Sequence, residues 1–291
     1  MIDTLPQDRS ARVLVVVAHP DDETFGTGSL LLHLAAAGVT TAVCCASRGE
    51  AGEVREGVTV PPGGLAALRE AELREAADLL GVSEIHLLDL VDSGMTGAAP
   101  SDSVTGVPLR ELVRRLSQVV LGFRPDALVT LDGRDGHRDH LRVRDAAERV
   151  GQDLGIPTWL HCLPRRLMRE WAQLLAGRDP HSPYLALGEL GTPDETITMR
   201  IDTSSHYERR AQAIALHRSQ TSPYEALPEE LRRAFLAAEH MVAPTGRTQA
   251  SPHGARDPES MGHHHTRSGC YWVHLEGRWS CALVSVTPAV R

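Results

Sequence analysis

Two short clusters of imidazole and carboxylate side chains carry the residue types that could do chemistry. The first is His19-Pro20-Asp21-Asp22-Glu23, which directly follows the apolar run Val13 to Ala18. The second, Asp132 to His140, directly follows another apolar run, Ala127 to Leu131. Imidazole nitrogen together with carboxylate oxygen is a donor set that suits Zn²⁺ in catalytic sites. The two clusters therefore predict a metal site, provided that the fold brings them together.

The spacing inside the clusters favours three particular ligands. His19 and Asp22 are three residues apart around a turn that Pro20 restricts, so both side chains can converge on one cation. His140 could complete a His, Asp, His set and leave the open coordination position that a catalytic zinc requires. Two alternatives stay open. The acidic residues of the first cluster could serve merely to complement a helix dipole, and a histidine such as His137 could be an inert surface residue.

The elements around the clusters must position them, and their pattern is regular over the first 160 residues. Short β-branched runs alternate with amphipathic helical patterns, which is typical of βαβ units around a parallel sheet. The expected strands cover 12–18, 40–46, 84–88, 127–131 and 157–162, and the expected helices cover 23–37, 65–80, 109–121 and 141–154. We therefore predict a doubly wound, Rossmann-like α/β fold with a mostly parallel sheet. Both clusters then lie at carboxyl ends of strands, where open α/β sheets bind ligands.

After about residue 180 the regular alternation ends, and a smaller portion with mixed strands and helices follows. We expect a strand over 195–201, helices over 204–218 and 229–238, and a terminal hairpin formed by 271–275 and 279–286. Arg209 and Arg210 are expected on the exposed face of their helix. Residues 244–268 are rich in Gly, Pro, Ser and Thr and include a run of three histidines, which indicates a mobile surface loop. The predicted domains are a catalytic core, 1–180, and a C-terminal α+β portion, 181–291, that completes the substrate pocket.

Composition excludes several classes of function. All 30 basic residues of the 291 are arginine, 38 residues are acidic, and the formal net charge is −8. Because no basic cluster dominates, we expect no nucleic-acid partner. The lack of lysine excludes Schiff-base chemistry and a P-loop. A dinucleotide fingerprint is also incomplete, since Leu31 stands where Gly26-Thr27-Gly28 would need a third glycine, and no Gly-x-Ser-x-Gly elbow is present.

The apolar runs and the cysteines bear on the cellular compartment. The longest purely apolar run, Val13 to Ala18, is far shorter than the roughly 20 residues of a membrane-spanning helix, so no membrane partner is expected. The first 12 residues lack a basic region and a cleavage site, which favours a cytoplasmic protein. Five cysteines without a Cys-x-x-Cys pair give no sign of a disulfide framework. A homo-oligomer remains open.

At this point the sequence resembles a known family, the LmbE-like or PIG-L N-acetylglucosaminyl deacetylases. The resemblance rests on Ala18 to Glu23 joined to Gly136 to His140, and it extends over about residues 12 to 222. Further segments agree, namely Ser47 to Glu53, Arg69 and Glu72 before Leu80 to Val82, Asp92 to Met95, and His217 to Gln220. Several of these segments look most like the actinobacterial mycothiol branch, which contains a deacetylase and an S-conjugate amidase.

The resemblance implies a metal-dependent hydrolase and a role for each motif residue. It implies Zn²⁺ as the cofactor, with Fe²⁺ as the other cation that remains open. The implied metal ligands are His19, Asp22 and His140, the implied general base is Asp21, and the implied oxyanion-stabilising group is a protonated His137. We further expect Glu23, Arg69, Asp92 and Asp135 to bind the substrate.

Two departures from the family and three functional hypotheses remain. Arg138 stands where the family usually has Pro, and Asp135 stands where the mycothiol branch has a tyrosine, so Asp135 could orient His137 or meet the substrate.

The favoured hypothesis is removal of the acetyl group from an N-acetylglucosaminyl small molecule, an amino-sugar conjugate, with release of acetate. The alternatives are an amidase acting on another amide, such as a mycothiol S-conjugate, and an inactive sugar-binding protein.

Overall fold

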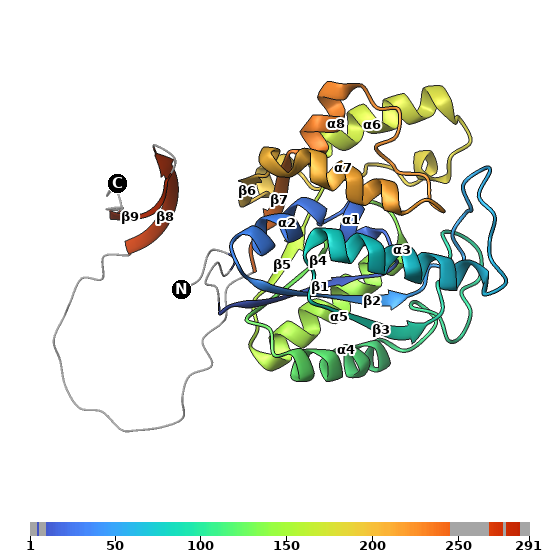
Figure 1. Ribbon diagram of the computed structural model, residues 1–291, viewed down its shortest axis with the longest axis horizontal. Helices are drawn as coiled ribbons and strands as arrows, with labels where there is room; N and C mark the ends of the chain where they lie inside the picture. The colour runs from blue at the N-terminus through green and yellow to red at the C-terminus, as the bar shows by residue number, and fades with distance from the viewer. Residues whose placement is uncertain (1–4, 6–9, 245–267, 276–277, 286–291) are drawn as a thin grey trace. The chain divides into compact units, whose positions relative to one another are not determined.

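The computed structural model describes residue 5, residues 10–244, and the backbone of 268–275 and 278–285. Its centre is a seven-stranded sheet with the order β3-β2-β1-β4-β5-β7-β6 (Figure 1). The first five strands in this order are parallel, and β7 and β6 continue the sheet in antiparallel fashion. The predicted Rossmann-like, mostly parallel sheet is confirmed.

The parallel strands are short, and all except β3 are buried along most of their length. They are β1 (Arg12–Val17), β2 (Thr40–Ser47), β3 (Glu84–Leu90), β4 (Ala127–Leu131) and β5 (Thr158–His161). Helices connect these strands. In chain order they are α1 (Asp22–Phe25), α2 (Gly28–Ala36), α3 (Gly64–Leu80), α4 (Leu109–Phe123) and α5 (Arg138–Leu154). Helix α3 ends as predicted at Gly81, which has a φ of +80° that glycine adopts without strain.

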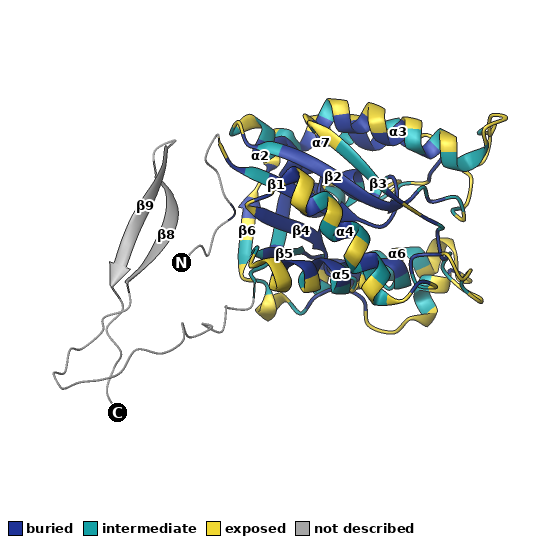
Figure 2. Ribbon diagram, turned by 90° about the horizontal axis from the view of Figure 1, so that it is seen from below, coloured by how far each residue is buried: buried dark blue, intermediate teal, exposed yellow. Residues whose placement is uncertain are grey.

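Each face of the sheet buries its own apolar core because successive strand residues point to opposite faces. Val13, Val15 and Val17 of β1 pack with the helices α2 and α3 on one face. Leu14 and Val16 pack with α4 and α5 on the other face. Figure 2 shows the dark, buried strands between helices whose outer faces are exposed. Two covered faces keep the strand ends, and hence the two clusters, in fixed positions.

The first helix differs from its prediction, because 23–37 forms two helices rather than one. The break falls at Gly26 and Thr27, where the chain passes close to its neighbours. A Cβ at Gly26 would lie 2.6 Å from the Leu131 side chain and 2.7 Å from the Asp22 carbonyl oxygen. The short helix α1 thus packs directly on the end of β4.

The chain after β5 adds helices and two strands to the edge of the sheet. They are α6 (Arg165–Arg178), three short 3-10 helices (Pro183–Ala186, Asp194–Thr196 and Ser204–His206), β6 (Met199–Asp202), α7 (Tyr207–Leu216), α8 (Glu229–Leu236) and β7 (Ala238–Val242). The sequence did not predict α6 or β7. A third apolar cluster, which includes Leu167, Tyr207 and Phe235, joins α6, α7 and α8.

The expectation that Arg210 is exposed is wrong. Its side chain is 1% exposed, and it donates to the carbonyl oxygens of Thr24, Phe25 and Gly26 and to Glu239. These contacts hold the bend between α1 and α2. The periodicity of α7 did not reveal this because an arginine on an amphipathic helix usually points to solvent.

Residues 246–291 form a separate compact unit from residues 1–245. Its described part is the antiparallel hairpin of β8 (Ser268–Leu275) and β9 (Arg278–Ser285), which confirms the predicted terminal hairpin. The mobile loop predicted over 244–268 lies almost wholly outside the described residues.

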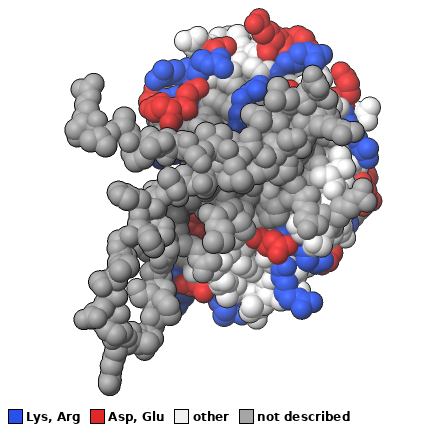
Figure 3. Space-filling view, turned by 90° about the vertical axis from the view of Figure 1, so that its left-hand side faces the viewer, with Lys and Arg blue, Asp and Glu red and all other residues white. Residues whose placement is uncertain are grey.

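Where described residues are visible in Figure 3, arginine and acidic side chains lie beside one another. Within the described part of the chain, no helix combines the length and the apolar character that a membrane crossing needs.

Candidate active site

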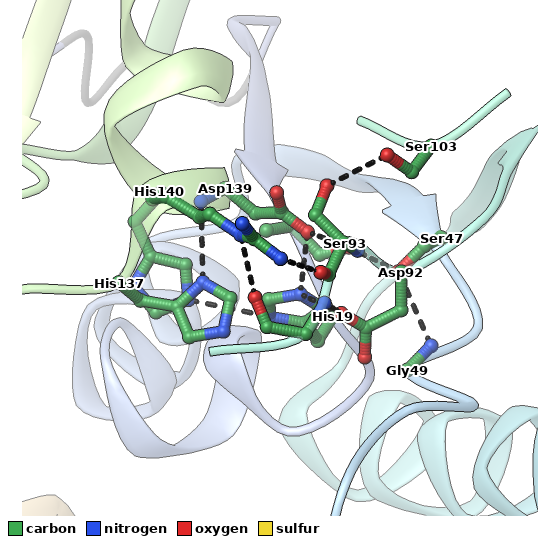
Figure 4. Close-up of polar contacts among 12 residues, drawn as sticks. His19, Ser47, Gly49, Asp92, Ser93, Ser103, His137, Asp139 and His140 are labelled. Atoms are coloured by element: carbon green, nitrogen blue, oxygen red, sulfur yellow. Dashed lines mark hydrogen bonds and ion pairs between the residues drawn. The ribbon is translucent and has the colours of Figure 1, made fainter. Parts of the chain in front are cut away.

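The two clusters meet at the carboxyl ends of β1 and β4, which are neighbours in the sheet. The turn from His19 to Asp22 leaves β1 and enters α1, and the segment from Asp132 to His137 leaves β4 and enters α5. Figure 4 shows the rings of His19, His137 and His140 gathered at this edge. The structure therefore brings together the residues that the sequence analysis placed in one site.

Donor atoms of His19, Asp22 and His140 lie close together. His19 Nδ1 lies 3.3 Å from His140 Nε2 and 3.4 Å from Asp22 Oδ2, and His140 Nε2 lies 3.1 Å from Asp22 Oδ1. Two ligand atoms that are each about 2.1 Å from a tetrahedral Zn²⁺ lie about 3.4 Å apart. The donor set and its spacing therefore fit a divalent cation held by His19, Asp22 and His140.

Other groups fix the orientation of the three donors. His19 Nε2 lies 3.2 Å from Asp139 Oδ2 and 3.4 Å from Asp92 Oδ1, which leaves Nδ1 for the contacts with Asp22 and His140. Asp22 Oδ2 accepts hydrogen bonds from the backbone N–H groups of Ala18 and His19, so Oδ1 is the freer oxygen. Carboxylates behind ligating histidines fix their tautomer and ring orientation.

The electrostatics of the site favour positive charge. Burial acts to lower the pKa of His140, but Asp135 and Asp22 outweigh it and raise that pKa to about 10. Burial acts in the same way on His19, whose pKa is nevertheless raised well above its ordinary value by Asp139, Asp22 and Asp92. The carboxylates around the two rings therefore favour positive charge here, which a bound divalent cation would supply in place of ring protons.

Asp21 directly precedes Asp22 in the turn between β1 and α1. Its Oδ2 pairs with Arg69 Nη2 at 2.9 Å, and its backbone N–H donates to Glu23 Oε2. Its φ of +125° is unusual for a residue other than glycine. Burial raises the pKa of Asp21 to about 6, while the charge of Arg69 acts to lower it. Asp21 is thus a buried carboxylate with a raised pKa, and its recorded ion pair is with Arg69.

His137 is the N-cap of α5, and its ring stacks on His140 with the ring centroids 4.8 Å apart. Its Nδ1 accepts a hydrogen bond from the backbone N–H of Asp139, so a proton on this ring belongs on Nε2. Burial, together with the positive charges of His19 and His140, lowers the pKa of His137 to about 4. This low pKa favours a neutral ring that can donate through Nε2–H, whereas the sequence analysis expected a protonated His137.

Two of the predicted substrate-binding residues lie behind the site. Glu23 is fully buried, and its Oε1 lies 2.9 Å from His217 Nε2. Arg69 is also buried and donates to the carbonyl oxygens of Pro20 and Gly49 in addition to its pair with Asp21. In this structure both side chains are occupied in supporting the turn that carries Asp21.

The other two predicted substrate-binding residues contact the histidines. Asp92 is buried beside His19 Nε2, and its Oδ1 also accepts the backbone N–H of Gly94. Asp135 is bonded to the ring of His140 and to the backbone N–H of His137, and not to the His137 ring. Of the alternatives for Asp135, a direct contact with the His137 imidazole is therefore not the arrangement recorded here.

Sequence reasoning missed several residues that support the site. Asp139 was passed over although it lies beside His140, and it bonds His19 and the backbone N–H of Ser93. The Arg138 guanidinium donates to the carbonyl oxygens of Ser93, Gly94 and Gly97 and so holds the loop after Asp92. The acidic residue between two histidines was the available signal for Asp139, whereas nothing in the sequence indicated the contacts of Arg138.

The fold and the site define a Rossmann-like protein in which a His, Asp, His donor set lies at the carboxyl ends of two neighbouring parallel strands, next to the carboxylate of Asp21, which is paired with Arg69. Residues 14–150 match the PIG-L family, described as GlcNAc-PI de-N-acetylase. A curated relative, the 1D-myo-inositol 2-acetamido-2-deoxy-alpha-D-glucopyranoside deacetylase of Geodermatophilus obscurus, is 30% identical over 271 residues, which cover 79% of this chain and 91% of the relative. The chain therefore belongs to the PIG-L family.

Solved structures agree on the fold. The N,N'-diacetylchitobiose deacetylase of Pyrococcus horikoshii matches with a TM-score of 0.53 and 22% identity, over 80% of this chain and 84% of that chain. The 4-carboxy-2-hydroxymuconate hydratase GalB of Pseudomonas putida KT2440 matches with a TM-score of 0.53 and 18% identity, over 84% of this chain and all of that chain. Because the same fold occurs in a hydratase, the function of this chain must be argued from its site.

Proposed function

We propose that this protein is a metal-dependent N-deacetylase that removes the acetyl group from an N-acetylglucosaminyl small molecule and releases acetate. The observation that carries the proposal is the position of Asp21. Its carboxylate is next to His19, Asp22 and His140 but is paired with Arg69, outside the set of three donors. Amide hydrolysis at a metal centre needs such an unligated base.

The named curated relative supports the choice of substrate class. It is a deacetylase of an inositol-linked N-acetylglucosamine, and it shares 30% identity over most of both chains. Such a substrate is a small amino-sugar conjugate. The resemblance of Asp92 to Met95 to the mycothiol branch points the same way.

His19, Asp22 and His140 would hold the cation, for which we favour Zn²⁺, with Fe²⁺ as the alternative. When bound, it supplies positive charge that polarises the amide carbonyl and makes a water molecule more acidic. Asp21 accepts the proton of that water as its oxygen attacks the carbonyl carbon. The Nε2–H group of neutral His137 donates to the carbonyl oxygen as negative charge develops there.

The carboxylate of Asp21 also completes the reaction. As the carbon–nitrogen bond breaks, Asp21 returns the proton to the departing nitrogen, so the products are a free amine and acetate. A pKa of about 6 suits both roles because it lies close to neutral pH. Arg69 keeps the carboxylate in place during both transfers.

Acetate and free amine released from a panel of compounds test the proposal. The panel contains N-acetylglucosaminyl-inositol, N-acetylglucosamine, diacetylchitobiose and a cysteinyl amide conjugate. We expect activity on the inositol conjugate, loss of activity after chelation, and recovery with Zn²⁺ or, without oxygen, with Fe²⁺. Cleavage of the cysteinyl amide alone would favour the amidase alternative. A folded, metal-loaded protein that releases no acetate from any member would refute the proposal.

A further inference from the structure

Asp135 lies in the turn between β4 and α5 with both carboxylate oxygens engaged. Its Oδ2 lies 2.5 Å from His140 Nδ1, and its Oδ1 accepts the backbone N–H of His137 at 3.1 Å. Among the described residues, the ion pair with His140 is the only one recorded for Asp135. The carboxylate is thus directed at one ring of the site.

The two nitrogens of His140 have separate partners. Nδ1 meets Asp135, whereas Nε2 faces Asp22 Oδ1 at 3.1 Å and His19 Nδ1 at 3.3 Å. A carboxylate at Nδ1 keeps the ring proton on that nitrogen and leaves the lone pair of Nε2 free to bind a cation. His19 has the corresponding arrangement with its nitrogens exchanged, since Asp139 meets its Nε2.

The turn that carries Asp135 is packed under a later segment of the chain. A Cβ at Gly136, where φ is +95°, would lie 2.4 Å from Leu187 and 3.2 Å from Leu190. The backbone N–H of Gly191 donates to the carbonyl oxygen of Arg134 at 2.8 Å. These contacts on both sides of Asp135 fix the backbone that aims its carboxylate at His140.

We propose that Asp135 is a positioning residue that orients His140 for the cation and strengthens metal binding, rather than a residue that binds substrate. This inference rests on the metal-dependent function proposed above. It assigns outer carboxylates to both ligating histidines: Asp139 and Asp92 to His19, and Asp135 to His140. Removing such an outer carboxylate typically weakens metal affinity 10- to 100-fold.

The test is the Zn²⁺ dissociation constant, measured by competition with a chromogenic chelator on metal-free protein. We expect Asp135→Ala to raise this constant by about 10- to 100-fold. We expect Asp135→Asn to raise it less, because the amide oxygen can still accept the Nδ1–H hydrogen bond. The matched control is Asp153→Ala on α5, which removes an exposed carboxylate that is paired with Arg149 and should leave the constant unchanged.

Thermal unfolding of the metal-free variants shows whether they are folded, and Asp135→Asn serves as the test if Asp135→Ala does not fold. Wild-type affinity in the folded Asp135 variants would overturn the inference. A rise in KM with no change in the Zn²⁺ dissociation constant would also overturn it, because Asp135 would then meet the substrate. A wild-type protein that binds Zn²⁺ but has no deacetylase activity would refute the proposed function alone.

Discussion

The guanidinium of Arg69 lies 2.9 Å from the carboxylate of Asp21, and both side chains are largely buried. The same guanidinium donates to the carbonyl oxygen of Pro20, which immediately precedes Asp21. Arg69 therefore fixes the backbone and the side chain of the proposed base together. A buried base that is fixed in this way needs little reorganisation before it accepts a proton.

Asp21→Asn should separate catalysis from metal binding. We expect metal content near that of the wild type, because Asp21 lies outside the three donors, and a fall in kcat by a factor on the order of 10² to 10⁴. Elemental analysis and steady-state kinetics measure the two effects. Loss of the metal in this variant would instead make Asp21 a ligand.

His137→Ala should also retain the metal, while kcat falls on the order of 10²- to 10³-fold. The effect should be on kcat more than on KM, because the Nε2–H group meets the carbonyl oxygen mainly in the transition state. His137→Gln, which keeps a neutral donor, should recover part of the loss. A change confined to KM would contradict the assigned role.

Arg138→Ala should weaken substrate binding through the loop after Asp92. The variant frees the carbonyl oxygens of Ser93, Gly94 and Gly97. We expect KM to rise about tenfold, which corresponds to about 1.4 kcal/mol, with metal content unchanged. Arg149→Ala, which removes an exposed arginine from the same helix, is the control. An unchanged KM would mean that the loop does not contact the substrate.

His217 should make stability depend on pH. Burial acts to lower its pKa, but Glu23, Asp21 and Glu72 outweigh burial and raise it above 6.5. Its protonated form therefore stabilises the fold below about pH 6.5, and this contribution is lost as pH rises through the higher folded pKa. His217→Gln should lose stability at low pH, with a difference from the wild type that shrinks as pH rises. Denaturant unfolding from pH 5.5 to 9 measures it, and a difference that is constant with pH would contradict the prediction.

The sheet and the clusters could be predicted from the sequence because they depend on local patterns. Val13 to Ala18 is apolar throughout, as a buried parallel strand requires, and the polar cluster follows directly. Helix α6 and strand β7 were not predicted. Strand β7 is short and includes the polar residues Glu239 and His240, so it lacks the apolar pattern of a buried strand. Glu239 is fully buried because it pairs with Arg210 and His161, which are distant in the sequence.

The support of the site could not be predicted for the same reason. Glu23 and His217 are 194 residues apart, and Glu72 accepts hydrogen bonds from Ser219 across 147 residues. The motif residues indicated which side chains matter but not which of them face solvent. Glu23 and Arg69 illustrate this, because carboxylate and guanidinium groups usually indicate an exposed surface rather than a buried support.

His19 and His140, which lie together in the proposed metal site, are 121 residues apart, and the pairing of β1 with β4 brings them together. An unfolded chain therefore offers no such site, and a cation bound there favours the folded chain alone. At a free concentration 100 times its dissociation constant, it would add about 2.7 kcal/mol to the free energy of unfolding. Metal supply in the cell would then set how long each molecule survives proteolysis, in addition to whether it is active.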